Sequence, residues 1–325
     1  MKHVTDVRSP EGDPPSDHEV DLSVDLGGIR LKNPVLSASG CFASGREVDR
    51  FYDVDELGAV IVKSLTLEPR GGLPTPRMAE TPSGMLNAIG LQNRGVDAWI
   101  AQDLPWLRQR AVPVIASIAG TSIDEYRKVA RKLGGLAGIV AVEVNISCPN
   151  VEDRNIVFAC RPEPSGAVIS AVCEELGVPV FAKLTPDVTD ITEIAQAVVA
   201  AGATGVSLIN TLLGMAIDVE TRRPKLANVV GGLSGPAVRP LAVRNIWQVH
   251  QALPHVPIIG SGGVSSGRDA IELILAGAVA VAVGTANFVD PFAAQEVVRG
   301  LSRWCAGHGV AGVAALRGSV RIGQG

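Results

Sequence analysis

The chain has 325 residues, of which 46% are hydrophobic and 19% are charged, and its formal net charge is −4. This composition excludes a globally disordered protein, and the acidic balance together with an aromatic content of 4% argues against a nucleic-acid-binding surface. The length is sufficient for one large α/β domain or two smaller ones.

The first segment of the chain is polar. Residues 1–20 carry Pro and Asp where a secretory signal would have an apolar core, so we predict a disordered tail rather than a signal peptide. No apolar run approaches the length of a membrane span. The five cysteines are odd in number and show no C-x-x-C spacing. We therefore expect free thiols, no metal site and a cytoplasmic location.

The predicted regular elements begin after this tail. Residues 21–31 alternate apolar and polar side chains around Gly27 and Gly28, which predicts a β-hairpin. Amphipathic stretches such as 191–202, 237–253 and 267–278 predict helices further along. Eight short β-rich runs precede or separate such stretches, at 34–39, 59–64, 113–118, 140–146, 179–184, 205–210, 257–262 and 279–284.

Eight strand–helix units predict an α/β fold, namely a closed (β/α)8 TIM barrel with the N-terminal β-hairpin at its bottom. An open Rossmann-type sheet is the alternative, but no G-x-G-x-x-G follows the first strand. We find no domain boundary, so residues 21–325 are predicted to form a single barrel domain.

Two long inserted loops are expected at the C-terminal face of the barrel, where barrel enzymes place their active sites. One runs over residues 65–93 and contains GMLNAIGLQN, and the other runs over residues 212–235 and ends in GGLSG. Loops of this length in a compact fold usually carry function.

Glycines follow the last two predicted strands. Gly262–Gly263 and Gly284–Thr285 stand in those loops, and Gly235 opens the helix before them. Each could be only a tight turn. Their joint position favours a phosphate site held by backbone N–H groups.

Two lysines, Lys63 and Lys183, each end an apolar strand. A lysine at a barrel mouth needs an anionic partner, because burying an unpaired ammonium is very costly. The alternative is a lysine whose ammonium reaches the solvent at the rim. Two lysines beside a phosphate site favour a ligand with more than one negative centre.

The predicted strand at 140–146 runs into the polar sequence NISCPN, residues 145–150. Most single cysteines are inert small hydrophobes, but Cys148 would face the same mouth as both lysines. Because no histidine ends a predicted strand, a proton-shuttling thiol fits better than a cysteine–histidine nucleophile. The amides of Asn87, Asn145, Asn150 and Asn210 suit a planar heterocycle, although some could only cap helices or tie loops.

At this point the chain resembles the class 1 dihydroorotate dehydrogenases. The likeness extends from about Asp21 to Phe292 and is dense in NPVLSASG, TPRMAETPSGMLNAIGLQN, VEVNISCPN, INTLLGMAIDVETRRPKLANVVGGLSGPA and AVGTANFVDPFA. It implies an FMN-dependent barrel that oxidises (S)-dihydroorotate to orotate in de novo pyrimidine (UMP) biosynthesis. Cys148 would be the base that takes the C5 proton.

The resemblance also implies the binding residues. FMN would be held by Ser39, Lys63, Ser64, Asn145, Lys183, Ile209, Gly235, Gly262, Gly263, Gly284 and Thr285. Orotate would be held by Lys63, Asn87, Ala88, Ile89, Gly90, Leu91, Asn145, Asn210 and Thr211. Lys183 would sit by the N1/O2 edge of the flavin, where negative charge collects on reduction.

MLNAIGLQN and NTLLGMAID resemble the 1B subclass, so a homodimer that passes electrons to NAD through an FAD/iron–sulfur subunit is expected. A fumarate-using 1A-type enzyme, or a dihydropyrimidine dehydrogenase-like reductase of uracil or thymine, is the alternative. A tRNA-modifying flavin barrel is disfavoured by the acidic balance and the absence of an appended basic domain. A non-redox phosphate-binding barrel, such as a synthase or isomerase, is a further alternative, and it would be colourless. The chain departs from the family pattern at Arg94, Ser117, Arg154–Asn155 and the C-terminal segment.

Overall fold

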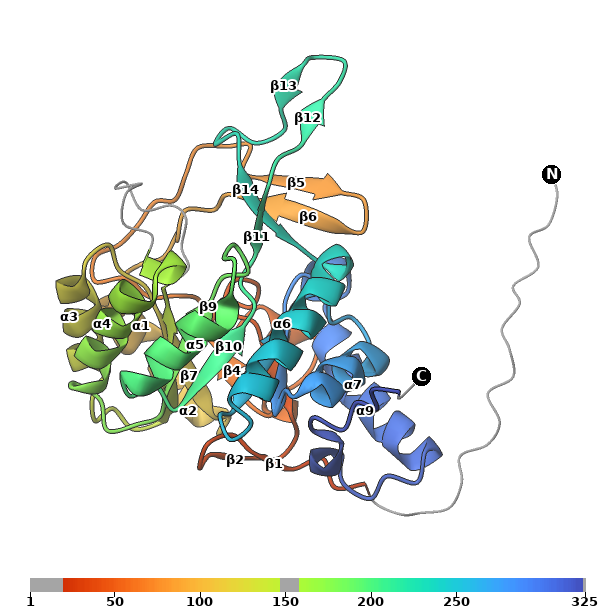
Figure 1. Cartoon of the computed structure of the whole chain (residues 1–325). Coiled ribbons are helices and arrows are strands. Elements are labelled where there is room, and N and C mark those ends of the chain that lie inside the picture. The colour runs from red at the N-terminus through yellow and green to blue at the C-terminus, as the bar shows by residue number, and fades with distance from the viewer. Residues whose placement is uncertain (1–19, 147–157, 324–325) are drawn as a thin grey trace.

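The computed structural model describes residues 20–146 and 158–323. The predicted tail lies outside the described residues, except for Val20 at its end. Cys148, Asn150 and the family departures Arg154 and Asn155 also lie outside them. Figure 1 shows the whole chain, with a barrel below and a smaller β-structure above it.

A ring of eight parallel strands forms the barrel, which confirms the predicted TIM-barrel fold. Six pairs join consecutive barrel strands, and a seventh joins the last strand to the first. The remaining gap is closed by Gly58, which donates its backbone N–H to the Val35 carbonyl at 2.8 Å. Each of the eight predicted β-runs corresponds to one strand, and only β8 begins outside its predicted run, by one residue. The strands are β3 (Val35–Ser37), β4 (Val60–Ile61), β7 (Val114–Ile118), β8 (Ile139–Asn145), β9 (Val180–Leu184), β10 (Gly205–Leu208), β15 (Ile258–Ser261) and β16 (Ala280–Val283).

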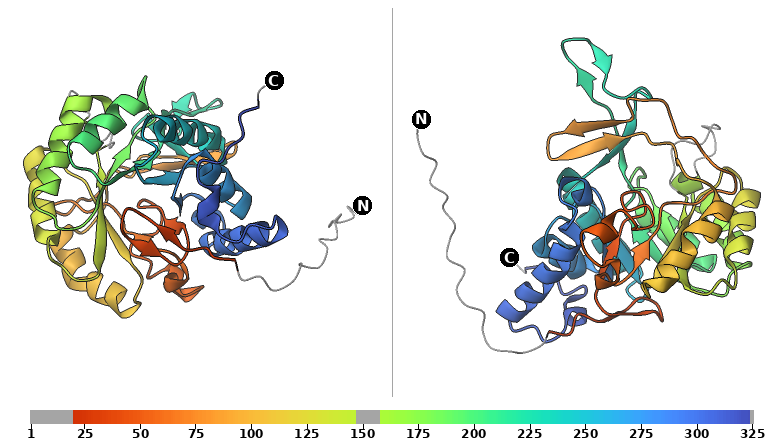
Figure 2. Two further views of the ribbon diagram at one scale, coloured as in Figure 1. Left: turned by 60° about the horizontal axis from the view of Figure 1, so that its bottom comes forward. Right: turned by 180° about the vertical axis from the view of Figure 1, so that it is seen from behind.

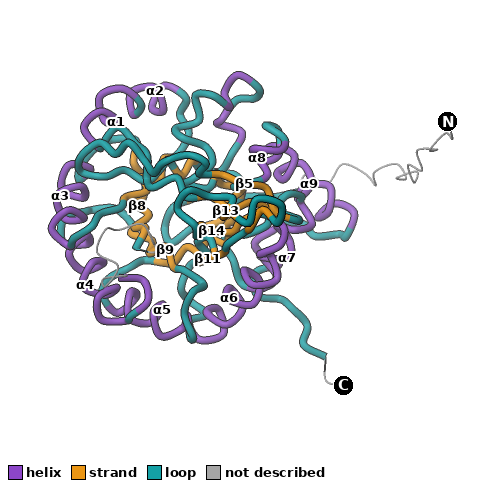
Figure 3. The backbone as a smooth tube through the Cα atoms, turned by 90° about the horizontal axis from the view of Figure 1, so that it is seen from above, coloured by secondary structure: helices purple, strands orange, loops and turns teal. Residues whose placement is uncertain are grey.

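Helices surround this ring on the outside, as the view from above shows (Figure 3). Hydroxyl or carboxylate side chains cap three of them, for example Ser122, which accepts from the Glu125 backbone N–H. The helices are α1 (Val96–Gln102), α2 (Leu104–Gln109), α3 (Ile123–Leu133), α4 (Pro162–Cys173), α5 (Ile191–Ala200), α6 (Arg239–Ala252), α7 (Gly267–Ala276), α8 (Ala286–Val289) and α9 (Ala293–Gly307). Short 3₁₀ turns are η1 (Val48–Arg50), η2 (Val54–Glu56), η3 (Phe158–Cys160), η4 (Pro236–Val238) and η5 (Val313–Leu316).

None of the helices in the described ranges is long and apolar enough to cross a membrane. The predicted helices at 191–202, 237–253 and 267–278 correspond to α5, η4 with α6, and α7. The assignment of residues 21–325 to a single domain stays a prediction.

The bottom of the barrel is closed by the predicted hairpin, whose strands β1 (Val24–Asp25) and β2 (Arg30–Leu31) pair antiparallel. Leu26 and Leu31 are fully buried, so the hairpin adds an apolar lid to the amino ends of the strands (Figure 2, left). Gly27 has φ 64°, and a Cβ there would lie 2.9 Å from the Thr204 side chain. Glycine therefore permits both the turn and the close approach.

The last segment of the described chain packs at the same end. The backbone of Asp21 donates to the Ala311 carbonyl and accepts from the Val313 N–H, both at 2.9 Å. The Arg317 guanidinium donates to the carbonyls of Gly277 and Val256 at 3.0 and 2.8 Å. The segment that matches the family pattern poorly is thus tied to the barrel by main-chain hydrogen bonds and by the Arg317 side chain.

The two long loops predicted at the C-terminal face contain regular structure that the sequence did not predict. Strands β5 (Met78–Thr81) and β6 (Gly84–Asn87) come from the first loop, and β11 (Leu212–Gly214) and β14 (Gly231–Ser234) come from the second. These four pair in the order β11-β14-β6-β5. A further hairpin, β12 (Ile217–Asp218) and β13 (Arg223–Pro224), projects beyond this sheet (Figure 1).

Candidate active site

A cavity of about 1110 Å³ lies at the carboxyl ends of the barrel strands, below the inserted sheet. Its size is that of a pocket for a large ligand, or for two smaller ones. All but one of the predicted binding residues within the described ranges line it. They are Ser39, Lys63, Ser64, Asn87, Ile89, Gly90, Leu91, Asn145, Lys183, Ile209, Asn210, Thr211, Gly235, Gly262, Gly263, Gly284 and Thr285.

Ala88 is the exception. Its side chain is buried in a small apolar cluster with Leu86 and Leu226, and it does not line the cavity. The predicted base, Cys148, lies outside the described residues. Both residues remain assigned by prediction alone.

The floor of the cavity is a buried polar network from adjacent strands. Asn145 and Lys183 are neighbours in the register of β8 and β9, so both point into the barrel from the same level. The Lys183 ammonium lies 3.7 Å from a carboxylate oxygen of Glu143 and 3.4 Å from the Ser39 hydroxyl. Lys183 is 6% exposed and Glu143 is fully buried. The floor therefore presents a positive charge whose counter-ion lies deeper in the barrel.

Two amides on the floor are fixed by hydrogen bonds. The Asn210 side-chain NH2 donates to the Asn145 side-chain oxygen at 3.1 Å, and the Asn145 NH2 donates to the Ser64 hydroxyl at 3.4 Å. The Tyr126 hydroxyl donates to the Asn145 carbonyl at 2.7 Å from behind the strand. Amides held in this way can present a fixed pattern of donors and acceptors to a ring with carbonyl and N–H groups.

A glycine-rich cradle forms another part of the cavity. Gly235, Gly262 and Gly263 have φ angles of 98°, 127° and 74°, a region that side chains with a Cβ rarely adopt. A Cβ on Gly263 would lie 2.7 Å from the Arg239 Cβ. The guanidinium of Arg239 pairs with Asp269 instead of pointing at the cradle. The cradle thus offers backbone groups at the start of η4 and α6, the arrangement that suits a phosphate.

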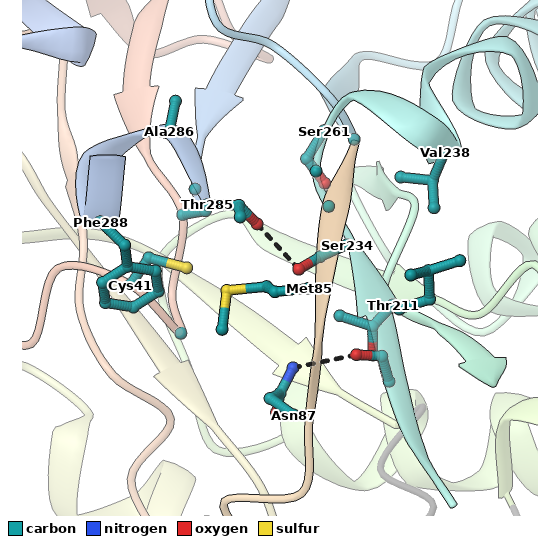
Figure 4. Close-up of a pocket in the computed structure, with 18 of the residues that line it drawn as sticks. Cys41, Met85, Asn87, Thr211, Ser234, Val238, Ser261, Thr285, Ala286 and Phe288 are labelled. Carbon is teal, nitrogen blue, oxygen red and sulfur yellow. Dashed lines mark hydrogen bonds between the residues drawn. The ribbon is translucent and has the colours of Figure 1, made fainter. Parts of the chain in front are cut away.

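The roof of the cavity comes from the inserted sheet. Asn87 on β6 donates its side-chain NH2 to the Gly232 carbonyl on β14 at 3.3 Å (Figure 4). A Cβ on Gly232 would lie 2.1 Å from the Thr211 hydroxyl oxygen. The two inserts and Thr211 are therefore packed closely over the floor.

Comparison with known proteins identifies the family. The family profile described as dihydroorotate dehydrogenase matches residues 21–304. The chain belongs to the dihydroorotate dehydrogenase family. It is 51% identical over 302 residues to a protein of Geotalea daltonii named dihydroorotate dehydrogenase B (NAD(+)), catalytic subunit, covering 93% of this chain and 99% of that protein. It is 53% identical over 277 residues to the protein of the same name from Anoxybacillus flavithermus, covering 85% and 88%.

Some lining residues of this dihydroorotate dehydrogenase family member were not predicted from the sequence. They include Cys41, Met85, Ser234, Val238, Ser261 and Phe288 (Figure 4). The Thr285 hydroxyl donates to the Ser234 hydroxyl at 2.8 Å. Burial raises the pKa of the Cys41 thiol to about 11, although Lys183 and Lys63 act in the opposite direction. Cys41 is therefore a neutral thiol at physiological pH.

Ser117 and Glu143 were also not predicted as site residues. A sequence signal existed for Glu143: Val142 and Val144 face the helices, so the glutamate between them must point into the barrel. Within the described ranges, no group of three or more His, Cys, Asp or Glu side chains is placed to hold a metal ion.

Proposed function

We propose that this chain is the catalytic subunit of an FMN-dependent dihydroorotate dehydrogenase, which oxidises (S)-dihydroorotate to orotate in de novo pyrimidine biosynthesis. The observation that carries the proposal is the cavity, which gathers two lysines, a glycine-rich cradle and fixed amides at one barrel mouth. The names of the relatives, which match nearly the whole chain, point to the same reaction.

FMN fits the residues present. Its phosphate would lie on the backbone of the cradle at Gly262–Gly263 and Gly284–Thr285, where a Cβ would occupy space or strain the chain. The ring would lie over the floor residues, with Lys183 beside the edge that becomes negative on reduction. When bound, FMN would accept the two electrons that leave with the C6 hydrogen of the substrate. The remaining proposed contacts are Ser39, Lys63, Ser64, Asn145 and Ile209.

Dihydroorotate would bind between the floor and the roof. Its carboxylate requires a cation or several N–H groups, which Lys63 and the backbone of residues 88–91 would provide. Its ring carries amide-like groups that match the side chains of Asn87, Asn145 and Asn210, with Thr211 beside them. A uracil-type substrate lacks the carboxylate and would leave these donors without a partner, which disfavours the dihydropyrimidine reductase alternative.

Cys148 would act as the general base that removes the C5 proton. A thiol with an ordinary pKa of about 8.5 comes closer to the operating pH than a serine hydroxyl does, and proximity in pKa favours proton transfer. This role is supported by the position of Cys148 in the sequence, three residues after the end of β8.

A partner subunit would accept the electrons from FMN and pass them to NAD. The relatives are named catalytic subunits of NAD(+)-dependent enzymes, and this sequence carries no G-x-G-x-x-G fingerprint after its first strand for binding NAD itself. We propose an FAD/iron–sulfur subunit in this role.

Residues 213–219, which run from β11 into the projecting hairpin at β12, would join two copies of the chain into a homodimer. These residues are called the projecting arm. Leu213, Met215, Ile217 and Val219 follow one another along this arm and are 47–77% exposed. Exposed apolar groups of this density usually mark an interaction surface. Cys41, Cys160, Cys173 and Cys305 are free thiols, in keeping with the cytoplasmic location that we propose.

The proposed function is tested by the visible spectrum and the acceptor range of the purified chain. We expect a bound-flavin spectrum and orotate formation with an artificial electron acceptor. NAD should be reduced only when the partner subunit is added. A colourless protein would contradict the flavin assignment, rapid fumarate reduction would favour the 1A-type alternative, and turnover of dihydrouracil without dihydroorotate turnover would favour the reductase.

A further inference from the structure

Glu143 is a buried carboxylate to which the proposed reaction assigns no role. It lies in β8 and has no exposed surface. It is two residues before Asn145, and both side chains are on the inward face of the strand. A carboxylate is rarely buried unless it is paired with a cation or receives hydrogen bonds, because its removal from water is costly. Its contacts therefore indicate why a glutamate stands there.

The two oxygens of Glu143 have different partners. Oε1 accepts a hydrogen bond from the Ser117 hydroxyl at 3.1 Å. Oε2 has no hydrogen-bond partner among the described residues and lies 3.7 Å from the Lys183 ammonium. In the strand register, Ser117 on β7 lies beside Glu143 on β8, and Asn145 on β8 lies beside Lys183 on β9. Three adjacent strands thus hold the carboxylate directly beneath the ammonium.

The same hydroxyl connects the carboxylate to the cavity floor. Ser117 is 2.9 Å from the Ser64 hydroxyl, which in turn accepts from the Asn145 side chain. Ser64, Asn145 and Lys183 all line the cavity, whereas Glu143 does not. Glu143 can therefore act on a ligand only through the groups above it.

We propose that Glu143 is a positioning residue that acts through Lys183, and that it sets the reduction potential of the bound flavin. This inference rests on the proposed function, because it needs FMN above Lys183. Glu143 fixes the ammonium in the floor and partly cancels its charge. Lys183 therefore stabilises the negatively charged reduced flavin less than an unpaired ammonium would.

The test is the two-electron midpoint potential of FMN in E143Q, a substitution that keeps the shape and removes the charge. We expect E143Q to bind reduced FMN at least about tenfold more favourably relative to oxidised FMN. For a two-electron couple this is a rise of about 30 mV. In a K183M background the same substitution should change the ratio of the affinities for reduced and oxidised FMN less than about twofold, because a carboxylate that has lost its cation takes up a proton.

S117A is the matched control. It removes a neutral hydroxyl from Glu143 without changing the charge, so it should shift the ratio less than about threefold. The inference is overturned by a rise smaller than tenfold, by a fall, by an equal shift in the K183M background, or by an equal shift in S117A. If Glu143 had only a structural role, E143Q would lower FMN occupancy but would not raise the FMN midpoint potential selectively in the presence of Lys183.

A second measurement serves if E143Q does not retain FMN. K183M protein should show the infrared carbonyl band of a protonated, buried carboxylic acid, and K183M/E143Q should lack this band. Absence of the band in K183M would show that Glu143 does not depend on Lys183 and would overturn the inference. Wild-type protein without any flavin would instead contradict the proposed function, so the two failures are distinguishable.

Discussion

Asn87 and Gly232 are 145 positions apart in the chain, yet the Asn87 side chain donates to the Gly232 carbonyl at 3.3 Å. This contact joins the two long inserts at the level of the cavity. The backbone pairing of β6 with β14 extends the connection into a four-stranded sheet. Residues proposed to bind the substrate are therefore held by a sheet built from two inserts. One insert follows β4 and the other follows β10.

Gly232→Ala should weaken dihydroorotate binding and leave FMN bound. A Cβ at this position would lie 2.1 Å from the Thr211 oxygen, so Thr211 must move. Because a displacement of about 1 Å can cost up to 10²-fold in rate, we expect kcat/KM to fall roughly 10- to 10²-fold. Steady-state kinetics with an artificial acceptor measures this. Gly71→Ala, in the other insert and with no atom within 4 Å of the new Cβ, should behave as wild type.

Gly284→Val should yield protein without flavin. Gly284 lines the cavity, and even a Cβ there would lie 3.2 Å from the Ala38 Cβ. The two further methyl groups of valine would occupy the proposed phosphate cradle. The ratio of flavin to protein absorbance after purification measures occupancy. Gly307→Ala, at the end of α9 with no neighbour within 4 Å of a Cβ, is the control. Full occupancy in Gly284→Val would refute the placement of the phosphate.

Cys148→Ala should retain FMN and orotate binding but lose the base. Flavin reduction by dihydroorotate at neutral pH should slow by roughly 10²–10⁴-fold, the usual contribution of a positioned base. Cys148→Ser should keep some activity, shifted to higher pH, because a hydroxyl ionises less readily. Rapid-mixing absorbance measurements follow the reduction. Cys160→Ala, which removes an exposed thiol, should react as wild type. A wild-type rate in Cys148→Ala would exclude the thiol as the base.

Cys41 should resist alkylation at neutral pH. Burial raises the pKa of this thiol to about 11, so the thiolate, which is the reactive form, amounts to only about one molecule in a thousand at pH 8. The alkylation rate should rise about tenfold per pH unit and level off near pH 11. Peptide mass mapping after iodoacetamide treatment compares Cys41 with the exposed Cys160, which should be modified first. Equal labelling of both thiols at pH 7.5 would contradict the raised pKa.

The barrel could be predicted from the sequence because its strands are buried on both faces and therefore read as short apolar runs. Residues 140–146 are typical: Val142 and Val144 pack outward, and β8, Ile139–Asn145, is offset from that range by one residue. The binding residues could be predicted in position because a parallel barrel brings the carboxyl ends of all its strands to one face. Their roles rested on the resemblance to the family.

The inserted sheet could not be predicted in the same way. β5 and β11 lie partly in solvent, so their sequences lack the continuous apolar pattern of the barrel strands. Their partners are distant in sequence, and pairing between such segments leaves no local periodicity. The turn residues Pro82–Ser83–Gly84 were the available signal for the β5–β6 hairpin. The Glu143–Lys183 contact is also non-local, since it depends on the register of β8 against β9.

The tie between Asp21 and Val313 makes the described chain almost circular. Hydrogen bonds of 2.9 Å on both sides of Asp21 hold the beginning and the end of the barrel next to each other, at the face opposite the cavity. Residues 21 and 313 could be joined by a short linker and the chain reopened in a distant surface loop, with the order of segments permuted and the barrel retained.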